Sequence, residues 1–327
     1  MIAKTSISKR LTDLKFPLEV LERYNELHRY YHTTEHLLQV MNSLEKNGTV
    51  SDELFLAAVY HDAVYDPKLN DNEERSAELF IEHSKTSGLS GDQKNKIKQY
   101  ILDTKVHKAS DPISQALITA DLEILEQPLD KLITYENQIL REYQFVDYKF
   151  YKPKRLEVLS SLNTNGKLDS LIAFVKQHKP MIAVFAGSFN PFHKGHYNVL
   201  KKAERIFDKV IIAFGKNPDK TDRTWPIPKQ IQHHQQEEYT GLLTDFVDSL
   251  GYDVIVVRGL RNSTDFQYEQ NQYRYIQELK PDIKIVNIFC DKEFEHISSS
   301  GIRTLREIWQ TQKLLARVRH VRSPIFK

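Results

Sequence analysis

The sequence predicts a protein of two domains: an all-α domain over residues 1–178, then an α/β domain with a Rossmann-like parallel sheet over residues 179–327. Three observations support this prediction. The length of 327 residues corresponds to about two domains at roughly 150 residues each. Helical patterns dominate up to residue 178. After Pro180, strand-sized apolar runs alternate with helical patterns.

Composition excludes several classes of protein. Lys and Arg number 46 against 44 Asp and Glu, a net charge of +2 that provides no long-range attraction to nucleic acid or anionic membrane. The single cysteine, Cys290, cannot form an intramolecular disulfide, which fits a reducing compartment. The first residues lack the apolar segment of a signal peptide, and the longest apolar runs are strand-sized. We expect a cytoplasmic protein with neither nucleic acid nor membrane as a partner.

Helix-forming segments follow one another in the first half. Residues 53–60 are apolar and rich in helix formers, and residues 73–84 place Ala77, Phe80 and Ile81 on one face. Further helices are expected at residues 136–143, 156–162 and 168–177. A turn signal at residues 163–166 precedes the last of these helices, and Lys179-Pro180 marks the end of the domain.

The second half begins with an apolar run at residues 181–186, which predicts a strand. A glycine-containing turn follows, then a helix and a second apolar run at residues 210–214. The expected buried face of that helix comprises Val199, Leu200, Ala203, Ile206 and Phe207. Strand, helix and strand at this spacing form a βαβ unit, which requires a parallel sheet. Residues 254–257 and 283–289 predict further strands.

The turn at residues 187–196 falls where the first strand ends, which is the edge of an open parallel sheet that binds ligands. Its glycines allow close approach of a ligand, and the following helix offers free N–H groups to an anion. His193 and His196 could donate hydrogen bonds to phosphoryl oxygens. A glycine-rich turn with surface histidines is the alternative.

Two later features favour phosphate binding. Ser298, Ser299 and Ser300 precede the helical pattern at residues 302–309, where hydroxyls cap the helix by default but also form an anion cradle. Arg303 lies in the first turn of that helix. Arg258 and Arg261 directly follow a predicted strand, and their guanidinium groups suit phosphate or carboxylate.

These segments resemble the nucleotidyltransferase superfamily, whose signature is an HxGH turn and a late ISSSxxR segment. Over about residues 181–309, the resemblance is closest to phosphopantetheine adenylyltransferase of coenzyme A biosynthesis. The discriminating stretches are GLLTDF at 241–246 and RGLRNSTDFQYE at 258–269. The HxGH turn alone fits nicotinate and nicotinamide mononucleotide adenylyltransferases equally well.

The resemblance implies attack of the 4′-phosphopantetheine phosphate on the α-phosphorus of ATP with Mg²⁺, giving dephospho-CoA and pyrophosphate. No protein base is required, because that phosphate is already ionised. His196, Lys220 and Arg258 would be catalytic. The ATP-binding residues would be Gly187, Ser188, Phe189, His193, His196, Arg261, Glu269, Ser298, Ser299, Ser300 and Arg303. The acceptor would contact Ser188, Lys220, Leu242, Leu243 and Arg258. The resemblance also implies a homo-oligomer.

The sequence departs from this family at three places. Ser188 replaces the usual threonine, and Asn190 replaces the usual aspartate. Residues 220–246 are shorter than expected, where a longer helix and strand normally lie. These departures leave open another phosphate acceptor, such as nicotinamide mononucleotide, and a change from the usual hexamer.

Histidines and aspartates in the first half suggest a metal site. His28, His32 and His36 recur at intervals of four, His61 and Asp62 end an apolar helix, and Asp121 follows the apolar residues 116–120. Imidazole and carboxylate ligands suit Mn, Fe, Ni or Zn, or Mg through the carboxylates. A lone His-Asp pair is more often structural. The surrounding residues must therefore distinguish a structural pair from a metal site.

Those surrounding residues resemble the HD superfamily of predicted metal-dependent phosphohydrolases over about residues 15–175. The stretches that carry the resemblance are RYYHTTEH at 29–36, YHDAVYD at 60–66, DNEERSA at 71–77, TKVH at 104–107, ADLEIL at 120–125 and REY at 141–143.

The resemblance implies a divalent metal on His36, His61, Asp62 and Asp121, and a phosphorylated metabolite as substrate. Glu73 would orient the attacking water, and His32 and His107 would serve a second metal or the phosphate. His28 would be structural or surface-exposed, and Asp71 and Glu74 would belong to a solvated helix N-terminus. The alternative is a regulatory module that binds a nucleotide without turnover.

Overall fold

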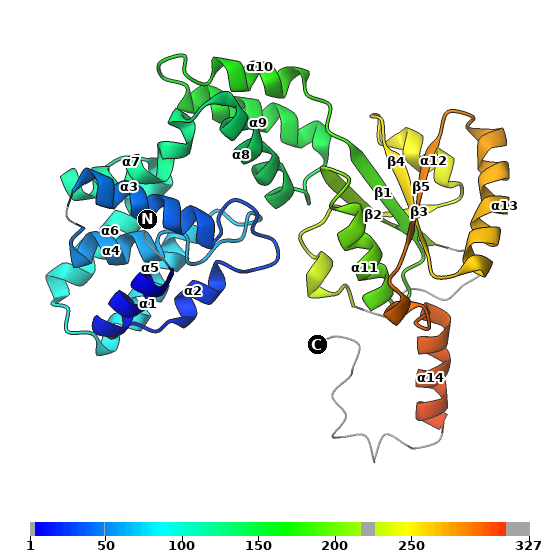
Figure 1. Ribbon diagram of the computed structural model, residues 1–327, viewed down its shortest axis with the longest axis horizontal. Helices are drawn as coiled ribbons and strands as arrows, with labels where there is room; N and C mark the ends of the chain where they lie inside the picture. The colour runs from blue at the N-terminus through cyan, green and yellow to red at the C-terminus, as the bar shows by residue number, and fades with distance from the viewer. Residues whose placement is uncertain (1–3, 49, 217–225, 312–327) are drawn as a thin grey trace. The chain divides into compact units, whose positions relative to one another are not determined.

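The computed structural model describes residues 4–48, 50–216 and 226–311, with side chains up to residue 306. The chain divides into two compact units (Figure 1). Unit 1 comprises Met1–Tyr143 and Lys152–Gln177, and unit 2 comprises Gln144–Tyr151 and His178–Lys327. The expected boundary at residue 178 differs from this division at residues 144–151, which group with unit 2.

Unit 1 is helical throughout its described residues. Its elements are α1 (Lys4–Asp13), α2 (Glu19–Arg23), α3 (Thr34–Asn47), α4 (Asp52–Tyr60), α5 (Asn72–His83), η1 (Ser84–Thr86), α6 (Gly91–Val106), α7 (Pro112–Asp121), η2 (Leu122–Glu126), α8 (Leu129–Glu142), α9 (Tyr148–Leu162) and α10 (Asp169–Gln177). The first turn of α9 belongs to unit 2.

Helix α4 lies at the centre of the main core, and all its residues from Leu54 to Tyr60 are buried. The Ser51 hydroxyl caps the helix by accepting a hydrogen bond from the Leu54 N–H at 3.2 Å. Helices α3 and α7 pack on α4 and on each other. This arrangement brings the start of α3 and the ends of α4 and α7 together, which determines where the candidate metal ligands meet.

Unit 2 contains a five-stranded parallel sheet in the order β3-β2-β1-β4-β5. Its elements are β1 (Ile182–Gly187), α11 (Lys194–Ala203), β2 (Lys209–Lys216), η3 (Lys229–Ile231), β3 (Gln236–Thr240), α12 (Leu243–Ser249), β4 (Ile255–Leu260), α13 (Ser263–Leu279), β5 (Lys284–Phe289), η4 (Lys292–Phe294) and α14 (Ser299–Thr311). The strand order reverses between β1 and β4. Ligands of such sheets bind at this switch point.

Helices cover both faces of the sheet because β1 is apolar on both sides. Ala183 and Phe185 pack with Val199 and Leu200 of α11. Ile182 and Val184, which alternate with them along the strand, pack in a second cluster with Leu243 and Phe246 of α12. The predicted strands β1, β2, β4 and β5 are therefore confirmed.

Residues 220–246, which are shorter than expected for the family, contain β3, a polar edge strand that pairs with β2 and was not predicted. One local expectation differs from the structure. Ile206 was expected on the buried face of α11, but the helix ends at Ala203 and Ile206 is 50% exposed.

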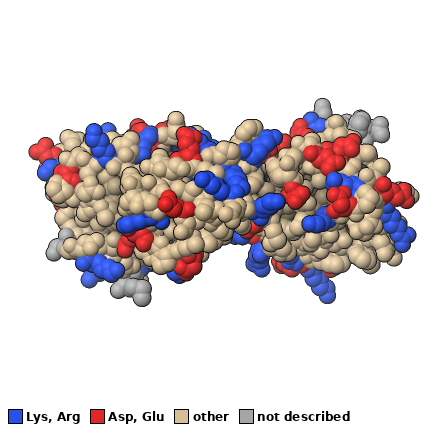
Figure 2. Space-filling model, turned by 90° about the horizontal axis from the view of Figure 1, so that it is seen from above, with Lys and Arg blue, Asp and Glu red and all other residues tan. Residues whose placement is uncertain are grey.

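Charged side chains of both signs are interspersed on the visible face of each unit (Figure 2). This distribution agrees with the near-zero net charge. Among the described residues, none of the helices is both long and apolar enough to cross a membrane.

Candidate functional sites

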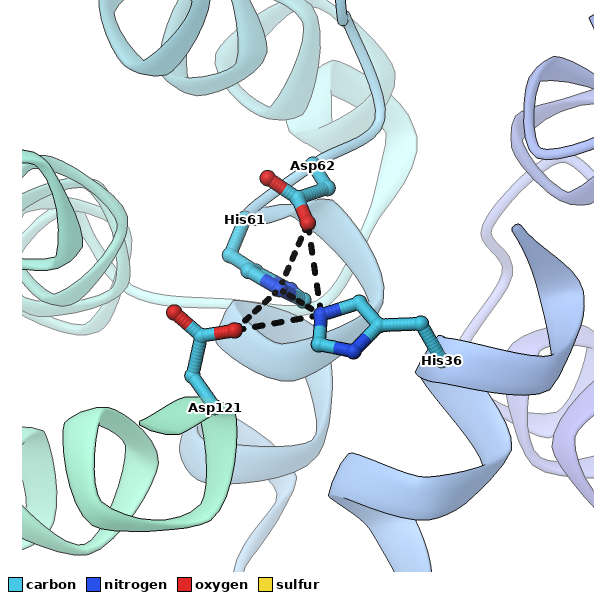
Figure 3. A group of neighbouring side chains, drawn as sticks. All are labelled: His36, His61, Asp62 and Asp121. Carbon is cyan, nitrogen blue, oxygen red and sulfur yellow. Dashed lines mark hydrogen bonds and ion pairs between the residues drawn. The ribbon is translucent and has the colours of Figure 1, made fainter. Parts of the chain in front are cut away.

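Four side chains of unit 1 converge at the junction of α3, α4 and α7 (Figure 3). His36 lies at the start of α3, His61 and Asp62 follow α4, and Asp121 ends α7. Each offers one ligand atom, and these atoms all lie within 4.8 Å of one another. Asp121 Oδ1 lies 3.1 Å from His36 Nε2, and Asp62 Oδ2 lies 3.0 Å from His61 Nε2.

Hydrogen bonds orient these ligands. His61 Nδ1 donates to the carbonyl of Ala58 at 2.8 Å, which leaves its Nε2 directed at Nε2 of His36, 3.4 Å away. A backbone acceptor on one imidazole nitrogen is the usual way to present the other nitrogen to a metal. At the other end of α7, the Asp111 carboxylate caps the helix through the N–H groups of Ile113 and Ser114.

The electrostatics of the group fit a bound cation. Burial opposes the charged form of His36, but hydrogen bonds to Asp121 and Asp62 outweigh it and raise the pKa of this imidazole. Burial likewise disfavours the charged form of Asp62, yet the neighbouring histidines hold its pKa well below the ordinary value. Two buried imidazoles and two carboxylates form a donor set suited to a first-row divalent metal.

His32 lies beside this group without belonging to it. Its ring centroid is 5.7 Å from that of His36, and its Nδ1 donates to Glu142 Oε2 at 2.7 Å. The Glu142 carboxylate is fully buried and also accepts from the Tyr65 hydroxyl. Glu142 lies in the REY stretch that carries the HD resemblance, but its residue type and spacing alone do not indicate this role.

The remaining candidates of unit 1 lie outside the group of four. Glu73 on α5 is half-buried, and burial together with the charge of Asp62 raises its pKa. His107 is exposed at the end of α6. His28 Nε2 donates to the carbonyl of Tyr65 at 2.7 Å, consistent with a structural role. At the N-terminus of α5, Asp71 occupies the cap position. Glu74 forms an ion pair with Lys105 at 2.5 Å.

In unit 2, the turn after β1 is shaped by Phe189. Its φ of 44° is in the left-handed region, and its ring packs against Gly187. A Cβ at position 187 would lie 2.8 Å from that ring, so glycine is required there. The same ring contacts His196 edge-on, with centroids 4.9 Å apart. The Phe189 ring thus lies between Gly187 and His196 and supports the imidazole of His196.

His193 and His196 stack with ring centroids 3.6 Å apart at the start of α11. The backbone N–H of His193 donates to His196 Nδ1 at 3.3 Å, so Nε2 of His196 carries the hydrogen and can donate to a ligand. Burial lowers the pKa of His193 to about 4 and, with the nearby charges of His193 and Arg261, lowers that of His196 well below its usual value. Both imidazoles are therefore neutral near pH 7.

The two arginines after β4 are paired with carboxylates. Arg258 donates to both oxygens of Glu269 at 2.7 and 2.8 Å, and Arg261 binds Asp265 at 2.8 and 2.9 Å. Hydrogen bonding to Glu269 overcomes burial and raises the pKa of Arg258, which stays charged. Its third nitrogen donates to the carbonyl of Ala186 at 2.9 Å.

The start of α14 is fastened to the turn after β1. Ser299 Oγ donates to the carbonyl of Pro191 at 2.9 Å, and Arg303 donates to the carbonyl of Asn190. Ser298 Oγ accepts the N–H of Gly301 at 3.0 Å, which is a helix cap. Both functions expected for these serines, capping and lining an anion site, are therefore compatible.

A cavity of about 570 Å³ opens over these groups. Its lining includes Ser188, His193, Gly195, His196, Arg261, Asp265, Tyr268, Glu269, Cys290, Ser298, Ser299, Ser300 and Arg303. The buried Nδ1 of His193 has no hydrogen-bond partner among the described residues. Two neutral histidines, an arginine and a helix N-terminus in one cavity can bind the phosphates of a nucleotide.

Known proteins match this part of the chain. A cytidylyltransferase-like family model matches residues 184–305. Phosphopantetheine adenylyltransferase from Mycoplasma capricolum is 37% identical over 134 residues, which cover 38% of this chain and 95% of that protein. Through unit 2, the chain belongs to the phosphopantetheine adenylyltransferase family.

Two further phosphopantetheine adenylyltransferases are similar to this chain. The Cytophaga hutchinsonii protein is 35% identical, covering 38% of this chain and 89% of its own length. The Clostridium botulinum protein is 34% identical, covering 37% and 79%. A solved lipopolysaccharide core biosynthesis protein from Thermoplasma volcanium matches 35% of the chain and 99% of its own at 17% identity. Its TM-score of 0.27 is too low to support an inference.

Several residues implied by the adenylyltransferase resemblance lie away from the cavity. Arg258 does not line the cavity and is covered by Glu269. Leu242 and Leu243 do not line it either. Leu242 is exposed, and Leu243 packs against the apolar cluster that contains Ile182 and Val184 of β1. Lys220 falls outside the described residues. Asp265 and Tyr268 were not assigned roles, although their spacing from Glu269 on α13 places all three on one helical face.

Proposed function

We propose that unit 2 transfers AMP from ATP to 4′-phosphopantetheine, giving dephospho-CoA and pyrophosphate, with Mg²⁺ bound to the ATP. An oxygen of the acceptor phosphate forms the new bond to the α-phosphorus, and the bond from that phosphorus to the bridging oxygen of pyrophosphate breaks. The observation that carries the proposal is the cavity in which His193, His196 and the serines of α14 face one space.

Positioning and charge neutralisation supply the catalysis in this proposal. Neutral His196 donates from Nε2 to an oxygen of the transferring phosphoryl group, where charge develops. Ser298–Ser300 and the N–H groups of α14 hold the β- and γ-phosphates, and Arg261 adds positive charge. Lys220 and Arg258 are assigned to the acceptor phosphate, as the family resemblance implies.

The test is incubation of the whole protein with ATP, Mg²⁺ and 4′-phosphopantetheine, followed by mass spectrometry for dephospho-CoA and an assay for pyrophosphate. A parallel reaction contains nicotinamide mononucleotide, because Asn190 and the short residues 220–246 favour considering another acceptor. Product from the first acceptor supports the proposal. Product from the second alone, or no dephospho-CoA at saturating ATP, contradicts it.

We also propose that unit 1 is an HD-type metal-dependent phosphohydrolase. The observation that supports this is the convergence of His36, His61, Asp62 and Asp121. A bound divalent cation supplies Lewis acidity at the phosphoryl oxygen and lowers the pKa of a water. Glu73 would orient the attacking water. The ester P–O bond breaks as the oxygen of the water bonds to phosphorus, and the leaving alcohol takes a proton that the water loses.

Metal analysis of the purified protein and hydrolysis of p-nitrophenyl phosphate test this second function. Bound Mn, Fe, Ni, Zn or Mg together with phosphate release supports it. Metal uptake without turnover of any phosphomonoester favours the regulatory module instead. An absence of metal before and after soaking contradicts a metal site altogether.

We further propose that the protein is a homo-oligomer through α13. This 17-residue helix has no buried residue, and it exposes Phe266, Tyr268, Tyr273, Tyr275 and Leu279. Of these, Tyr268, Tyr275 and Leu279 lie at positions i, i+7 and i+11 and share one face of the helix. An exposed apolar face of this kind is typical of a protein–protein contact. Size-exclusion chromatography with light scattering gives the molar mass in solution and tests the proposal. A monomer at micromolar concentration contradicts it.

A further inference from the structure

Besides the cavity of unit 2, a cavity in unit 1 begins at two of the candidate metal ligands, and its volume exceeds that of a phosphate group. Its volume is about 670 Å³, which is within the range of small-molecule sites. One wall is α3, and the other is the continuous segment α7–η2–α8. His36 and Asp121 line it, so a phosphoryl group at the ligands would have the rest of the cavity beside it.

Four of the residues that α3 contributes to the cavity lie in a row along one face of the helix. Its members at positions i, i+3, i+7 and i+10 are His36, Gln39, Ser43 and Lys46. Ten residues of α-helix span roughly 15 Å, so Lys46 lies about that far along the cavity from the metal ligand. The opposite wall contributes Ile124, Gln127 and Lys131.

The charged side chains that line this cavity indicate the size and charge of the ligand that it can bind. Lys46 and Lys131 are exposed, and neither forms an ion pair with another described residue. Between His36 and Glu45, the side chains of α3 that line the cavity are uncharged: Gln39, Asn42 and Ser43. Glu45 and Glu123 also line the cavity, so its walls are not uniformly basic and would repel a polyanion such as nucleic acid. A small molecule with separated charges suits this pattern.

We propose that the substrate of unit 1 is a linear phosphomonoester with a second anionic group roughly 15 Å from its phosphate. The phosphate binds at the four ligands, the uncharged middle lies along Gln39 and Gln127, and the second anion binds Lys46 with help from Lys131. This inference rests on the proposed phosphohydrolase function and adds the substrate class to it.

The experiment uses α,ω-alkane bisphosphonates of increasing length as molecular rulers, because their carbon–phosphorus bonds resist hydrolysis. Their affinity for the full chain loaded with Mn²⁺ is measured by calorimetry and compared with alkyl monophosphonates of equal length. We expect the bisphosphonate to bind about tenfold more tightly when its ends are roughly 15 Å apart, and equally at short lengths.

Variants locate the second anion site. Lys46→Ala should abolish the tenfold advantage and leave monophosphonate binding unchanged, and Lys131→Ala should reduce it. Lys98→Ala, on the exposed surface of α6 outside this cavity, is the matched control and should change nothing.

The outcomes separate this inference from the function on which it rests. If Mn²⁺ and monophosphonates bind but a second phosphonate adds nothing at any length, the substrate class is wrong and the metal site stands. If the advantage survives in Lys46→Ala, the assignment of that lysine is overturned. If the chain binds no Mn²⁺, both proposals fail.

Discussion

Both carboxylate oxygens of Glu269 accept hydrogen bonds from one edge of the Arg258 guanidinium group, from Nη2 at 2.7 Å and from Nε at 2.8 Å. Glu269 lines the nucleotide cavity, whereas Arg258 lies behind it. An acceptor phosphate that binds Arg258 directly must therefore displace Glu269. The pair also joins β4 to α13, because Arg258 belongs to the strand and Glu269 to the helix.

Removing the carboxylate of this pair should destabilise unit 2. Glu269→Ala leaves a largely enclosed cation with one backbone acceptor, and we expect a loss of about 2–3 kcal/mol in unfolding free energy, measured by urea denaturation. The exposed pair of Lys154 and Glu157 is the control, and Glu157→Ala should have almost no effect. Equal stability of the two variants would show that the enclosed pair contributes nothing.

His196→Ala should lower kcat of the adenylyl transfer by about 100-fold while the KM for ATP changes little. The reason is that Nε2 of His196 donates to charge that develops in the transition state. Steady-state kinetics with 4′-phosphopantetheine measures both constants. An unchanged kcat would remove His196 from the mechanism, and a rise in KM alone would make it a ground-state contact.

The strands of unit 2 could be predicted from sequence wherever they are buried on both faces. β1 is a continuous apolar run, as a central parallel strand requires. β3 could not be predicted, because Gln236–Thr240 is an edge strand with polar side chains. Its pairing with β2 depends on backbone hydrogen bonds, which the side-chain pattern does not reveal.

The candidate metal ligands could be identified by residue type and by the HD resemblance, and the helices then bring them together. Glu142 could not be assigned in the same way. It contacts the backbone of residues 30–32, about 110 positions earlier in the chain, and no local pattern encodes such a contact. Nor does local sequence show that Glu269 covers Arg258.

Asp62→Ala should abolish metal binding and phosphatase activity without reducing adenylyl transfer. Asp62 supplies one of two carboxylates to the group of four, and its loss leaves too few anionic donors for a divalent cation. Elemental analysis and both activity assays on one preparation give the answer. Loss of both activities would mean that the units fold in a coupled manner, and retained metal would exclude Asp62 as a ligand.

Glu142 should make the stability of unit 1 fall in acid. Although burial favours the neutral form, the charge of His32 and hydrogen bonds lower the Glu142 pKa from 4.5 to about 2. The unfolded chain therefore binds the proton first as the pH falls. The carboxylate contributes about 3 kcal/mol above pH 4.5, and this contribution is lost progressively between about pH 4.5 and pH 2.

Glu142→Gln tests that effect, because its amide oxygen can still accept the N–H groups of Tyr30, Tyr31 and His32. Below pH 4.5, the stability difference between wild type and variant should shrink by about 1.4 kcal/mol per pH unit, as followed by urea unfolding. A difference that is independent of pH would show that the charge of Glu142 plays no part.

Lys209 makes residues 144–151 necessary to unit 2. Its ammonium group is buried at the start of β2 and donates to the carbonyls of Gln144 and Val146, the latter at 2.9 Å. Burial lowers its pKa to about 7. A chain of residues 179–327 lacks both acceptors, so it should be about 3 kcal/mol less stable than residues 144–327 in urea unfolding. Lys209→Met should recover much of that loss in the short chain, because it removes the unsatisfied ammonium. Equal stability of the two lengths would contradict this role.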